Sequence, residues 1–499
     1  MSRLFGLAAL VFCVGACTLL LDTSRSQCRT DADCAAFAGT VCDTREQLCV
    51  ARSMPPGPGP GTIPVSGGEM GAPDAGMSDA AAPPASANCL AANKPLVTIE
   101  GEITTSATLS CDRDYLLVGT VFVTPGVVLT IQKGTTVRGD KASTGTLVVQ
   151  PGGKLLAVGT ADEPIVFTSA VPESARQPGD WGGVILLGRA PVNGAAGAPR
   201  PQIEGLLKGG EFGGADPSDG SGALKYVRIE YSGSKLGPNN EINGLTLGGV
   251  GSGTVLDFIQ VRATTDDCFE FFGGTVSAKH LVCQNNGDDG FDWDNGYQGR
   301  LQFLFLQQDP EVADETNGFE GDNDPTGSLN EPRSNPTVFN ATLCGKNLEL
   351  DKQQYGMLLR RSTLGTFRNL IVSGFEAGLD LRDATTEVEI THSIFHGNLL
   401  ENLAYAEVTG GSGVLADDDG GLDEQAYVLA ASRRNLMMDP ALVDCFDGNA
   451  PRPYPGAALV QNAATPPDDG FFDPQAAFVG AFRDANDGWA RGNWIRWGR

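Results

Sequence analysis

Histidine is scarce in this chain of 499 residues, which contains only 3. Zinc or copper sites built from several histidines are therefore disfavoured. Positive charge is also limited, since 35 Lys and Arg stand against 61 Asp and Glu and leave a net charge of −26. A field of this sign repels nucleic-acid phosphate, and no basic stripe offsets it locally. We therefore expect no nucleic-acid partner.

Long apolar runs are missing as well, and the main candidate is Leu4–Val14, with 11 residues. Such a run is too short to span a bilayer. It leads directly into Val14-Gly15-Ala16-Cys17, and the whole segment resembles a bacterial lipoprotein signal. We therefore expect residues 1–16 to be removed as a signal peptide and Cys17 to carry the lipid that holds the protein at the membrane. Thr18 in place of an acidic residue favours the bacterial outer membrane; an ordinary cleaved signal peptide is the alternative.

Cysteine, by contrast, is well represented, with 12 residues. Losing Cys13 with the signal and assigning Cys17 to lipid leaves ten, an even number that suits disulfides in an oxidising compartment. Four of them crowd into residues 17–50 and are expected to form two disulfides of open connectivity: Cys28, Cys34, Cys42 and Cys49. A four-cysteine metal site is the competing interpretation, but the paired C-x-x-C spacing of zinc sites is absent. The other six are expected to pair as Cys89 with Cys111, Cys268 with Cys283, and Cys344 with Cys445.

The composition changes sharply in residues 51–88. Pro, Gly and Ala supply 23 of these 38 residues, and none is aromatic. Such a segment buries too little surface to offset its ordering entropy, so we expect a disordered linker that holds the next domain away from the membrane. Residues 89–499 contain no second linker of this kind and are predicted to form one long domain.

Short apolar strands recur along that domain at a regular interval. One set comprises Val255–Val261, Val276–Val282, Leu301–Leu306, Phe367–Val372 and Val388–Ile394. A second set falls between them: Phe269–Phe272, Phe291–Asp294, Phe319–Glu320, Met357–Leu359 and Gly378–Leu381. Neighbouring intervals of 21 and about 25 residues match one turn of a parallel β-helix, with Gly, Asn and Asp at its corners. The prediction is an all-β solenoid; a two-sheet sandwich would explain the strands but not the interval.

Five blocks of the same region carry a family resemblance: Trp181–Gly188, Ile203–Gly205, Tyr226–Tyr231, Glu241–Gly253 and Asp288–Asp294. They resemble a large group of uncharacterised bacterial surface proteins with a right-handed parallel β-helix of the pectate-lyase-like type. The resemblance covers roughly residues 96–499 and implies a fold and a location without an activity. The cysteine cluster followed by a Pro/Ala/Gly tether is similar to myxobacterial surface lipoproteins.

The repeat also predicts an acidic ladder, because side chains alternate between the two faces of a strand. Aligning Phe269, Phe291 and Phe319 as inward residues gives two outward columns, Glu270 with Asp292 and Glu320, and Phe272 with Asp294 and Asp322. Rungs lie about 4.8 Å apart, so stacked carboxylates repel unless a cation, a proton or an arginine intervenes. We therefore predict a Ca²⁺ site whose ligands are Asp292, Asp294, Glu320 and Asp322. The alternative is that these acids face solvent and cap turns.

The same register places Arg360 and Arg382 in the column of Asp294 and Asp322. They could pair with those carboxylates or bind an anionic sugar. The preferred function is a surface-exposed outer-membrane lipoprotein whose β-helix binds glycan, matrix or envelope partners without catalysis. A calcium-dependent polysaccharide lyase or hydrolase is the alternative, although no set of lyase or polygalacturonase motifs is found and no catalytic residue is assigned. A scaffold within an envelope complex is the third class.

Overall fold

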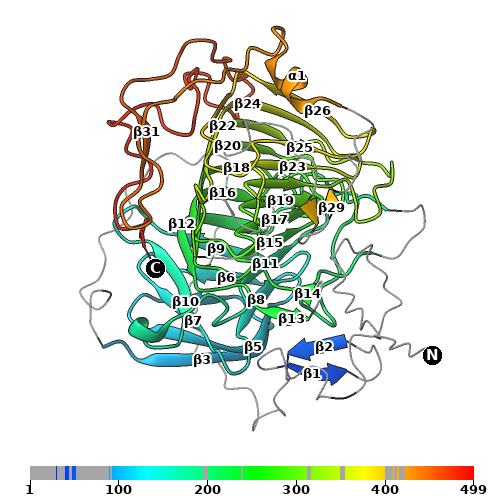
Figure 1. Ribbon diagram of the computed structural model, residues 1–499. Helices are drawn as coiled ribbons and strands as arrows, with labels where there is room; N and C mark the ends of the chain where they lie inside the picture. The colour runs from blue at the N-terminus through cyan, green and yellow to red at the C-terminus, as the bar shows by residue number, and fades with distance from the viewer. Residues whose placement is uncertain are drawn as a thin grey trace, which may run out of the picture.

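The strands stack above one another in parallel and wind into a right-handed β-helix with a 23-stranded sheet (Figure 1). This computed structural model describes residues 93–194, 200–237, 240–311, 316–348, 354–398 and 422–498. It also describes Thr30, Cys89 and four short strands, 40–43, 48–51, 408–409 and 413–414. The predicted fold class is confirmed, and the sandwich is excluded because the strand partners are rungs above and below.

The early rungs consist of β3 (Leu96–Ile103), β4 (Ala107–Leu109), β5 (Asp114–Val123), β6 (Val128–Ile131), β7 (Thr136–Gly139), β8 (Thr146–Val149), β9 (Lys154–Val158), β10 (Ile165–Ser169), β11 (Val184–Leu187) and β12 (Gly222–Glu230). The later rungs consist of β15 (Leu245–Gly248), β16 (Val255–Arg262), β17 (Phe269–Phe272), β18 (Ala278–Gln284), β19 (Phe291–Asp294), β20 (Arg300–Gln307), β21 (Phe319–Gly321), β22 (Thr337–Cys344), β23 (Met357–Leu359), β24 (Leu364–Ser373), β25 (Asp380–Leu381), β26 (Glu387–Thr391) and β27 (Ile394–His396).

Short antiparallel pairs and one helix lie outside this sheet. The pairs are β1 (Thr40–Asp43) with β2 (Leu48–Ala51), β13 (Lys235–Gly237) with β14 (Asn240–Glu241), β28 (Val408–Thr409) with β29 (Gly413–Val414), and β30 (Leu442–Asp444) with β31 (Arg452–Pro455). The helix is α1 (Glu424–Leu429), which begins at Asp423 because the carboxylate of Asp423 accepts the backbone N–H of Ala426. A 3₁₀ turn covers Glu173–Ala175.

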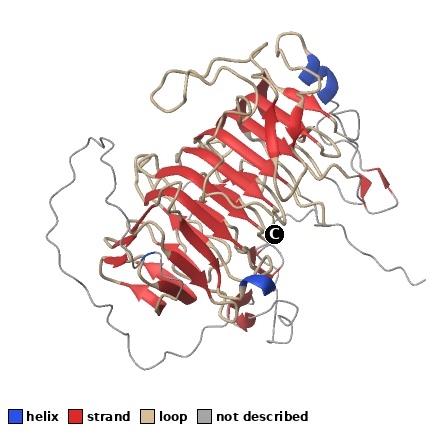
Figure 2. Ribbon diagram, turned by 90° about the vertical axis from the view of Figure 1, so that its left-hand side faces the viewer, coloured by secondary structure: helices blue, strands red, loops and turns tan. Residues whose placement is uncertain are grey.

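Inward side chains of each rung stack on their equivalents in the next rung. Ile259 of β16 lies over Leu281 of β18, which lies over Leu304 of β20. These residues belong to one continuous apolar core that extends along the solenoid. A rung therefore obtains most of its stability from its neighbours, as expected for a solenoid. Figure 2 shows the ladder of strands from the side, with loops projecting from the corners.

The sequence located most rungs but not all of them. The expected strand Val388–Ile394 is divided into β26 and β27, and His392 adopts a φ of 57° between them. The strand β22 was not anticipated. It is preceded by a loop insertion that lengthens the interval from Phe319 to Met357 beyond the regular spacing. The interval therefore identifies the fold but misses a rung where a corner loop is long.

Residues 442–498 fold back along one flank of the solenoid and make no further rung among the described residues. In Figure 1 this red segment runs from the last rungs toward β12. We refer to residues 442–498 as the C-terminal strap. Amide side chains on the sheet hold it, since Asn369 Nδ2 donates to Ala464 O at 2.8 Å and Gln260 Nε2 donates to Arg496 O at 2.9 Å. The sequence prediction of one β-helix domain over residues 89–499 did not anticipate this return.

Three disulfides join the residues that were expected to pair: Cys89 with Cys111, Cys268 with Cys283, and Cys344 with Cys445. The last of these connects β22 to the C-terminal strap. Cys17, Cys28 and Cys34 lie outside the described residues, as do residues 52–88 of the predicted linker, whose first residue, Ala51, ends β2. Cys42 and Cys49 face each other in the register of β1 and β2, and the pairing in this cluster stays a prediction. Within the described part of the chain, no helix is long and apolar enough to cross a membrane.

Candidate functional site

The first acidic column lies on the outer face of β17, β19 and β21. Phe269 stacks on Phe291 and Phe291 on Phe319, and all three rings are buried in the core. The residues that follow them therefore point outward, and the register pairs Glu270 with Asp292 and Asp292 with Glu320. The alignment predicted from the repeated phenylalanines is the alignment that is observed.

The second column also follows the predicted register. Phe272 lies opposite Asp294 in the paired strands. Backbone hydrogen bonds between the parallel rungs extend this column to the later rungs. Asp322 N donates to Trp293 O, Arg360 N to Gly321 O and Arg382 N to Leu359 O. Asp294, Asp322, Arg360 and Arg382 are thus successive members of one column.

A third line of polar residues occupies the turn just before these strands. The side chains of Asp267, Asp289 and Asn317 each accept the backbone N–H of the equivalent residue one rung further on, at 2.7, 2.6 and 3.0 Å, the last donated by Tyr355. Asp266 and Asp288 precede the first two members. The signal for this line in the sequence is the pair of Asp-Asp dipeptides 22 residues apart, and the line was not predicted.

These columns bring carboxylates close enough to share a cation. Three groups have ligand oxygens that all lie within 4.8 Å of one another: Asp266 with Asp267 and Asp288, Asp267 with Glu270 and Asp292, and Asp289 with Asp292 and Glu320. Asp292 belongs to two groups. Of the four predicted calcium ligands, Asp292 and Glu320 are brought together, whereas Asp294 and Asp322 belong to none of the three groups. We refer to the seven residues of these groups as the acidic cluster.

Several members of the acidic cluster are buried without enough hydrogen-bond donors. Asp266 is only 5% exposed, and its carboxylate accepts no hydrogen bond from any described residue. The Oδ1 atom of Asp292 is buried and likewise lacks a donor among the described residues. Glu270 is better served, because Asn243 Nδ2 donates to it. A buried carboxylate without donors is unstable as an anion, so the cluster requires protons or cations.

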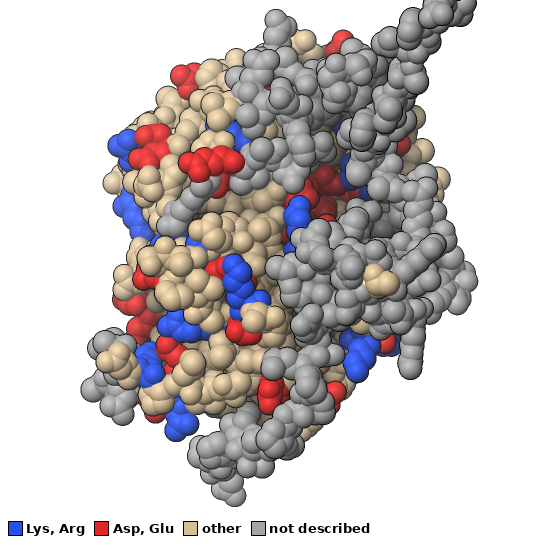
Figure 3. Space-filling view, turned by 60° about the horizontal axis from the view of Figure 1, so that its bottom comes forward, with Lys and Arg blue, Asp and Glu red and all other residues tan. Residues whose placement is uncertain are grey.

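Burial and mutual repulsion both act on the titration of this cluster. Burial raises the pKa values of Asp266, Asp267, Glu270, Asp289 and Asp292 well above their usual range, and the neighbouring carboxylates raise them further. Burial also raises the pKa of nearby Glu241 to about 8, with Glu204 adding to the effect. Figure 3 shows one recess in which Asp and Glu side chains gather beside Lys or Arg.

Arginines compensate only one end of this face. Arg360 pairs with Glu320 and, through Nε at 3.1 Å, with Asp322, while Arg361 Nη1 lies 2.5 Å from Asp322. Burial alone would raise the pKa of Glu320, but Arg360 and a hydrogen bond from Asp289 hold it below the usual value. Arg382 pairs instead with Asp380 at 3.1 Å. The two predicted arginines are therefore engaged with carboxylates, whereas on the rungs before them Lys235 lowers the pKa values of Asp266 and Glu241 without offsetting the effect of burial.

The chemistry available follows from this asymmetry. Oxygen ligands without competing donors suit a hard cation such as Ca²⁺, which accepts carboxylates in flexible geometry. The pair Asp289 and Glu320 offers a second possibility, because burial and neighbouring carboxylates raise the pKa of Asp289 whereas Arg360 and Asp289 lower that of Glu320.

Comparison with known proteins matches residues 101–414 to the family described as the pectate-lyase like beta helix domain. The chain belongs to this family. No curated protein and no solved structure matches the chain. The acidic cluster lies within the pectate-lyase like domain, as do Arg360 and Arg382, which directly follow β23 and β25, whereas the C-terminal strap lies outside the matched residues.

Proposed function

We propose that this protein is a lipid-anchored surface protein of the bacterial outer membrane whose β-helix binds a polysaccharide, in the matrix or on an envelope partner, through calcium held by the acidic cluster. The observation that carries the proposal is the buried, donor-free Oδ1 of Asp292 at the meeting point of two carboxylate groups. Calcium takes six to eight oxygen ligands, so a cluster that supplies three or four leaves positions for sugar hydroxyl or carboxylate groups.

The arginines support binding rather than elimination chemistry. A polysaccharide lyase needs a base that accepts a proton from the sugar, and an arginine can serve as this base only if it readily loses its own proton. Burial would lower the pKa of Arg360, but Glu320 and Asp322 raise it well above the usual value. Arg360 is therefore a poor base, and its position suits a structural cation at the end of the acidic cluster. Arg382 is 8% exposed and paired, which suits the same role.

A calcium-dependent polysaccharide hydrolase is the second candidate, favoured by one specific observation. Asp289 has a raised pKa and Glu320 a lowered one, and the two side chains are hydrogen bonded. Two neighbouring carboxyls whose pKa values are shifted apart are a feature of acid–base catalytic sites, including those of glycosidases. Release of reducing ends from a polysaccharide, lost in Asp289→Asn but kept in Asp162→Asn at an exposed site, would replace the binding function with this one.

The binding function is tested by calorimetry with the purified full chain. Calcium should bind to the chelator-treated protein, and polygalacturonate should then bind only in the presence of calcium. Asp292→Asn should weaken calcium binding at least tenfold because it removes a ligand common to two groups. Asp162→Asn is the matched control. Polysaccharide binding that persists in chelator and is insensitive to Asp292→Asn would contradict the proposal.

The lipid anchor is tested separately. Cys17→Ser should move the protein from the detergent phase to the aqueous phase after phase separation while leaving its circular dichroism spectrum unchanged, because the strands of the β-helix begin only at Leu96. A Cys17→Ser protein that stays in the detergent phase would contradict the anchor without bearing on the calcium site.

A further inference from the structure

A column of aromatic rings lies on a different corner of the solenoid from the acidic cluster. It comprises Tyr226 of β12, Phe258 of β16, His280 of β18 and Phe303 of β20, all with φ between 51° and 62°. Successive rings are stacked, with centroids 4.5, 4.1 and 4.9 Å apart. The left-handed backbone at each corner turns the side chain outward, so the rings form a ladder on the flank beneath the C-terminal strap.

The strap is fixed above this ladder by amide side chains. Gln302 both donates to Asp473 O at 3.5 Å and accepts Asp473 N at 2.8 Å. Asn340 Nδ2 donates to Phe478 O at 2.7 Å. Within the strap itself, the indole Nε1 of Trp489 donates to Ala481 O at 2.9 Å. These contacts hold the residues of the strap in place independently of any ligand.

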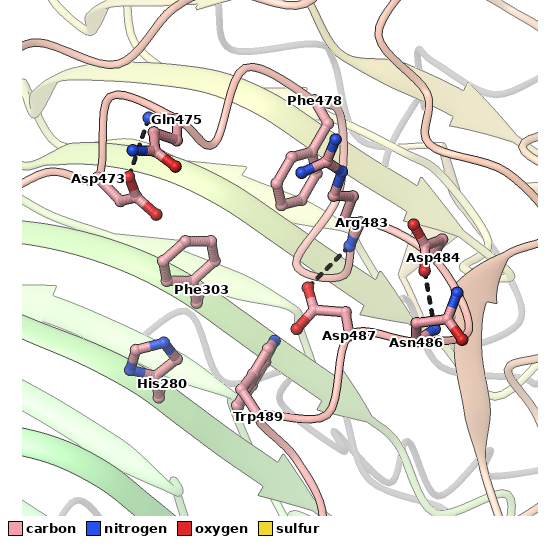
Figure 4. Close-up of a pocket in the computed structure, with 10 residues that line it drawn as sticks. All are labelled: His280, Phe303, Asp473, Gln475, Phe478, Arg483, Asp484, Asn486, Asp487 and Trp489. Atoms are coloured by element: carbon pink, nitrogen blue, oxygen red, sulfur yellow. Dashed lines mark hydrogen bonds between the residues drawn. The ribbon is translucent and has the colours of Figure 1, made fainter.

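A pocket of about 490 Å³ lies between the aromatic ladder and the strap (Figure 4). Its apolar side is formed by His280, Phe303, Phe478 and Trp489. Its polar side is formed by residues of the strap alone: Asp473, Gln475, Arg483, Asp484, Asn486 and Asp487. This volume lies within the range of small-molecule sites, which combine apolar or aromatic walls with a few polar groups.

Two of the three carboxylates on the polar side, those of Asp473 and Asp487, each have one oxygen available to a ligand. One oxygen accepts the backbone N–H of a nearby strap residue: Asp473 that of Gln475 at 2.9 Å and Asp487 that of Arg483 at 3.0 Å. The second oxygen of each accepts no hydrogen bond from the described residues. In Figure 4 these two carboxylates lie on either side of the Phe303 ring, and that of Asp487 points between Phe303 and Trp489.

The charge around the pocket is mixed. Arg483 lies among the three lining aspartates, and Lys279 interacts with Asp473 and has its pKa lowered by burial. The ring nitrogen Nδ1 of His280 is held by Asp257 at 2.8 Å. A surface with both donors and acceptors around aromatic rings matches a ligand with many hydroxyl groups and apolar C–H faces better than it matches a lone ion.

We propose that this pocket binds a neutral saccharide, whose C–H groups contact the edges of the stacked aromatic side chains while Asp473 and Asp487 accept its hydroxyl groups. This site goes beyond the function proposed above. It lies on β18, β20 and the C-terminal strap instead of β17, β19 and β21, and it uses no calcium.

The test screens the full chain, in chelator, against an array of neutral oligosaccharides of hexoses, followed by calorimetry with the best binder. Asp487→Asn should weaken binding about tenfold, the value of one charge-assisted hydrogen bond, and binding should change the fluorescence of Trp489. Trp489→Phe retains an aromatic wall and should keep most of the affinity. Asp468→Asn, at an exposed position of the strap outside the pocket, should leave binding unchanged.

Absence of binding to every neutral oligosaccharide would overturn the proposal, as would equal affinities of the wild type and Asp487→Asn. Binding of tetramethylammonium in competition with the saccharide would assign the pocket to organic cations and also overturn it. Because the assay contains chelator, its failure is distinct from failure of the calcium-dependent function.

Discussion

On each of two flanks of the solenoid, side chains of the same kind stack on one another, but the energetic consequences are opposite. At the corner of β16, β18 and β20 the stacked groups are aromatic rings, and each contact adds dispersion and burial. On β17, β19 and β21 the stacked groups are carboxylates, and each contact adds repulsion in a poorly hydrated site. The comparison indicates that the aromatic ladder contributes to the fold, whereas the acidic cluster destabilises it unless protons or cations neutralise its charge.

The largest expected effect comes from a charge placed inside the stack of phenylalanine rings in the core. Phe291→Asp puts an unpaired carboxylate between Phe269 and Phe319, and we expect a loss of about 4 kcal/mol or more in the free energy of unfolding. Phe291→Leu should lose less than about 2 kcal/mol. Urea denaturation followed by circular dichroism measures both. Equal stability of Phe291→Asp and the wild type would contradict an inward Phe291.

The next effect is a pH dependence of the stability that arises from the acidic cluster. Carboxyls with folded-state pKa values above their unfolded values stabilise the protein below about pH 4, and this contribution is lost as pH rises through the folded-state values, of which that of Glu241 is about 8. In chelator the melting temperature should therefore fall from pH 5 to pH 8. Calcium at 100 times its dissociation constant should restore about 2.7 kcal/mol at pH 8.

The control for this prediction is the double variant Asp292→Asn with Asp294→Asn, which should lose the response to calcium. Calorimetric scans at several pH values provide the measurement. A melting temperature that rises with pH in chelator, or one that ignores calcium at pH 8, would show that the acidic cluster is surface charge without a cation.

The third effect concerns the C-terminal strap, which lies over the aromatic ladder. Asn340 donates to the carbonyls of Ala476, Phe478 and Gly480 at 3.1, 2.7 and 3.3 Å. Asn340→Ala leaves these buried acceptors with fewer donors and should lower the stability by about 2 kcal/mol. Limited proteolysis should then cut the C-terminal strap first. Gln461→Ala, at an exposed position of the strap, is the control and should leave its protection intact.

The smallest expected effect is a gain in stability, and it comes from a substitution in the acidic cluster. Asp292→Asn removes one negative charge from the centre of the acidic cluster and supplies an amide donor to its neighbours. In chelator at pH 8 it should stabilise the protein by about 1 kcal/mol. In saturating calcium the same substitution should destabilise it relative to the wild type. Urea denaturation in the two buffers gives the sign of each change, and a variant that destabilises the protein equally in both would contradict the repulsion described here.

The sequence predicted the acidic columns because their register depends on local pattern. The repeated phenylalanines at 269, 291 and 319 set which residues point outward, so Asp292 and Glu320 could be paired without a structure. The turn acids Asp266 and Asp267 were missed because the turn before a strand has no fixed alternation. Their contribution depends on burial, which the sequence pattern does not report.

The C-terminal strap could not be predicted for a different reason. Its contacts join residues far apart in the chain, such as Gln302 with Asp473 and Asn340 with Phe478. Glutamine and asparagine within a strand pattern look like ordinary solvent-facing residues, and no periodicity indicates their partners. The aromatic pocket depends on those partners, so it is visible only in three dimensions.

The return of the strap changes how this solenoid is expected to unfold. Repeat proteins usually fray from an end, since each rung touches only its neighbours. Here a single segment crosses many rungs, with Ala464 held by Asn369 of β24 and Asn493 held by Arg228 of β12. The disulfide from Cys344 to Cys445 fixes one point of that crossing. Rungs that would otherwise open independently are thereby coupled across the length of the stack, so the domain should lose its structure in one cooperative step.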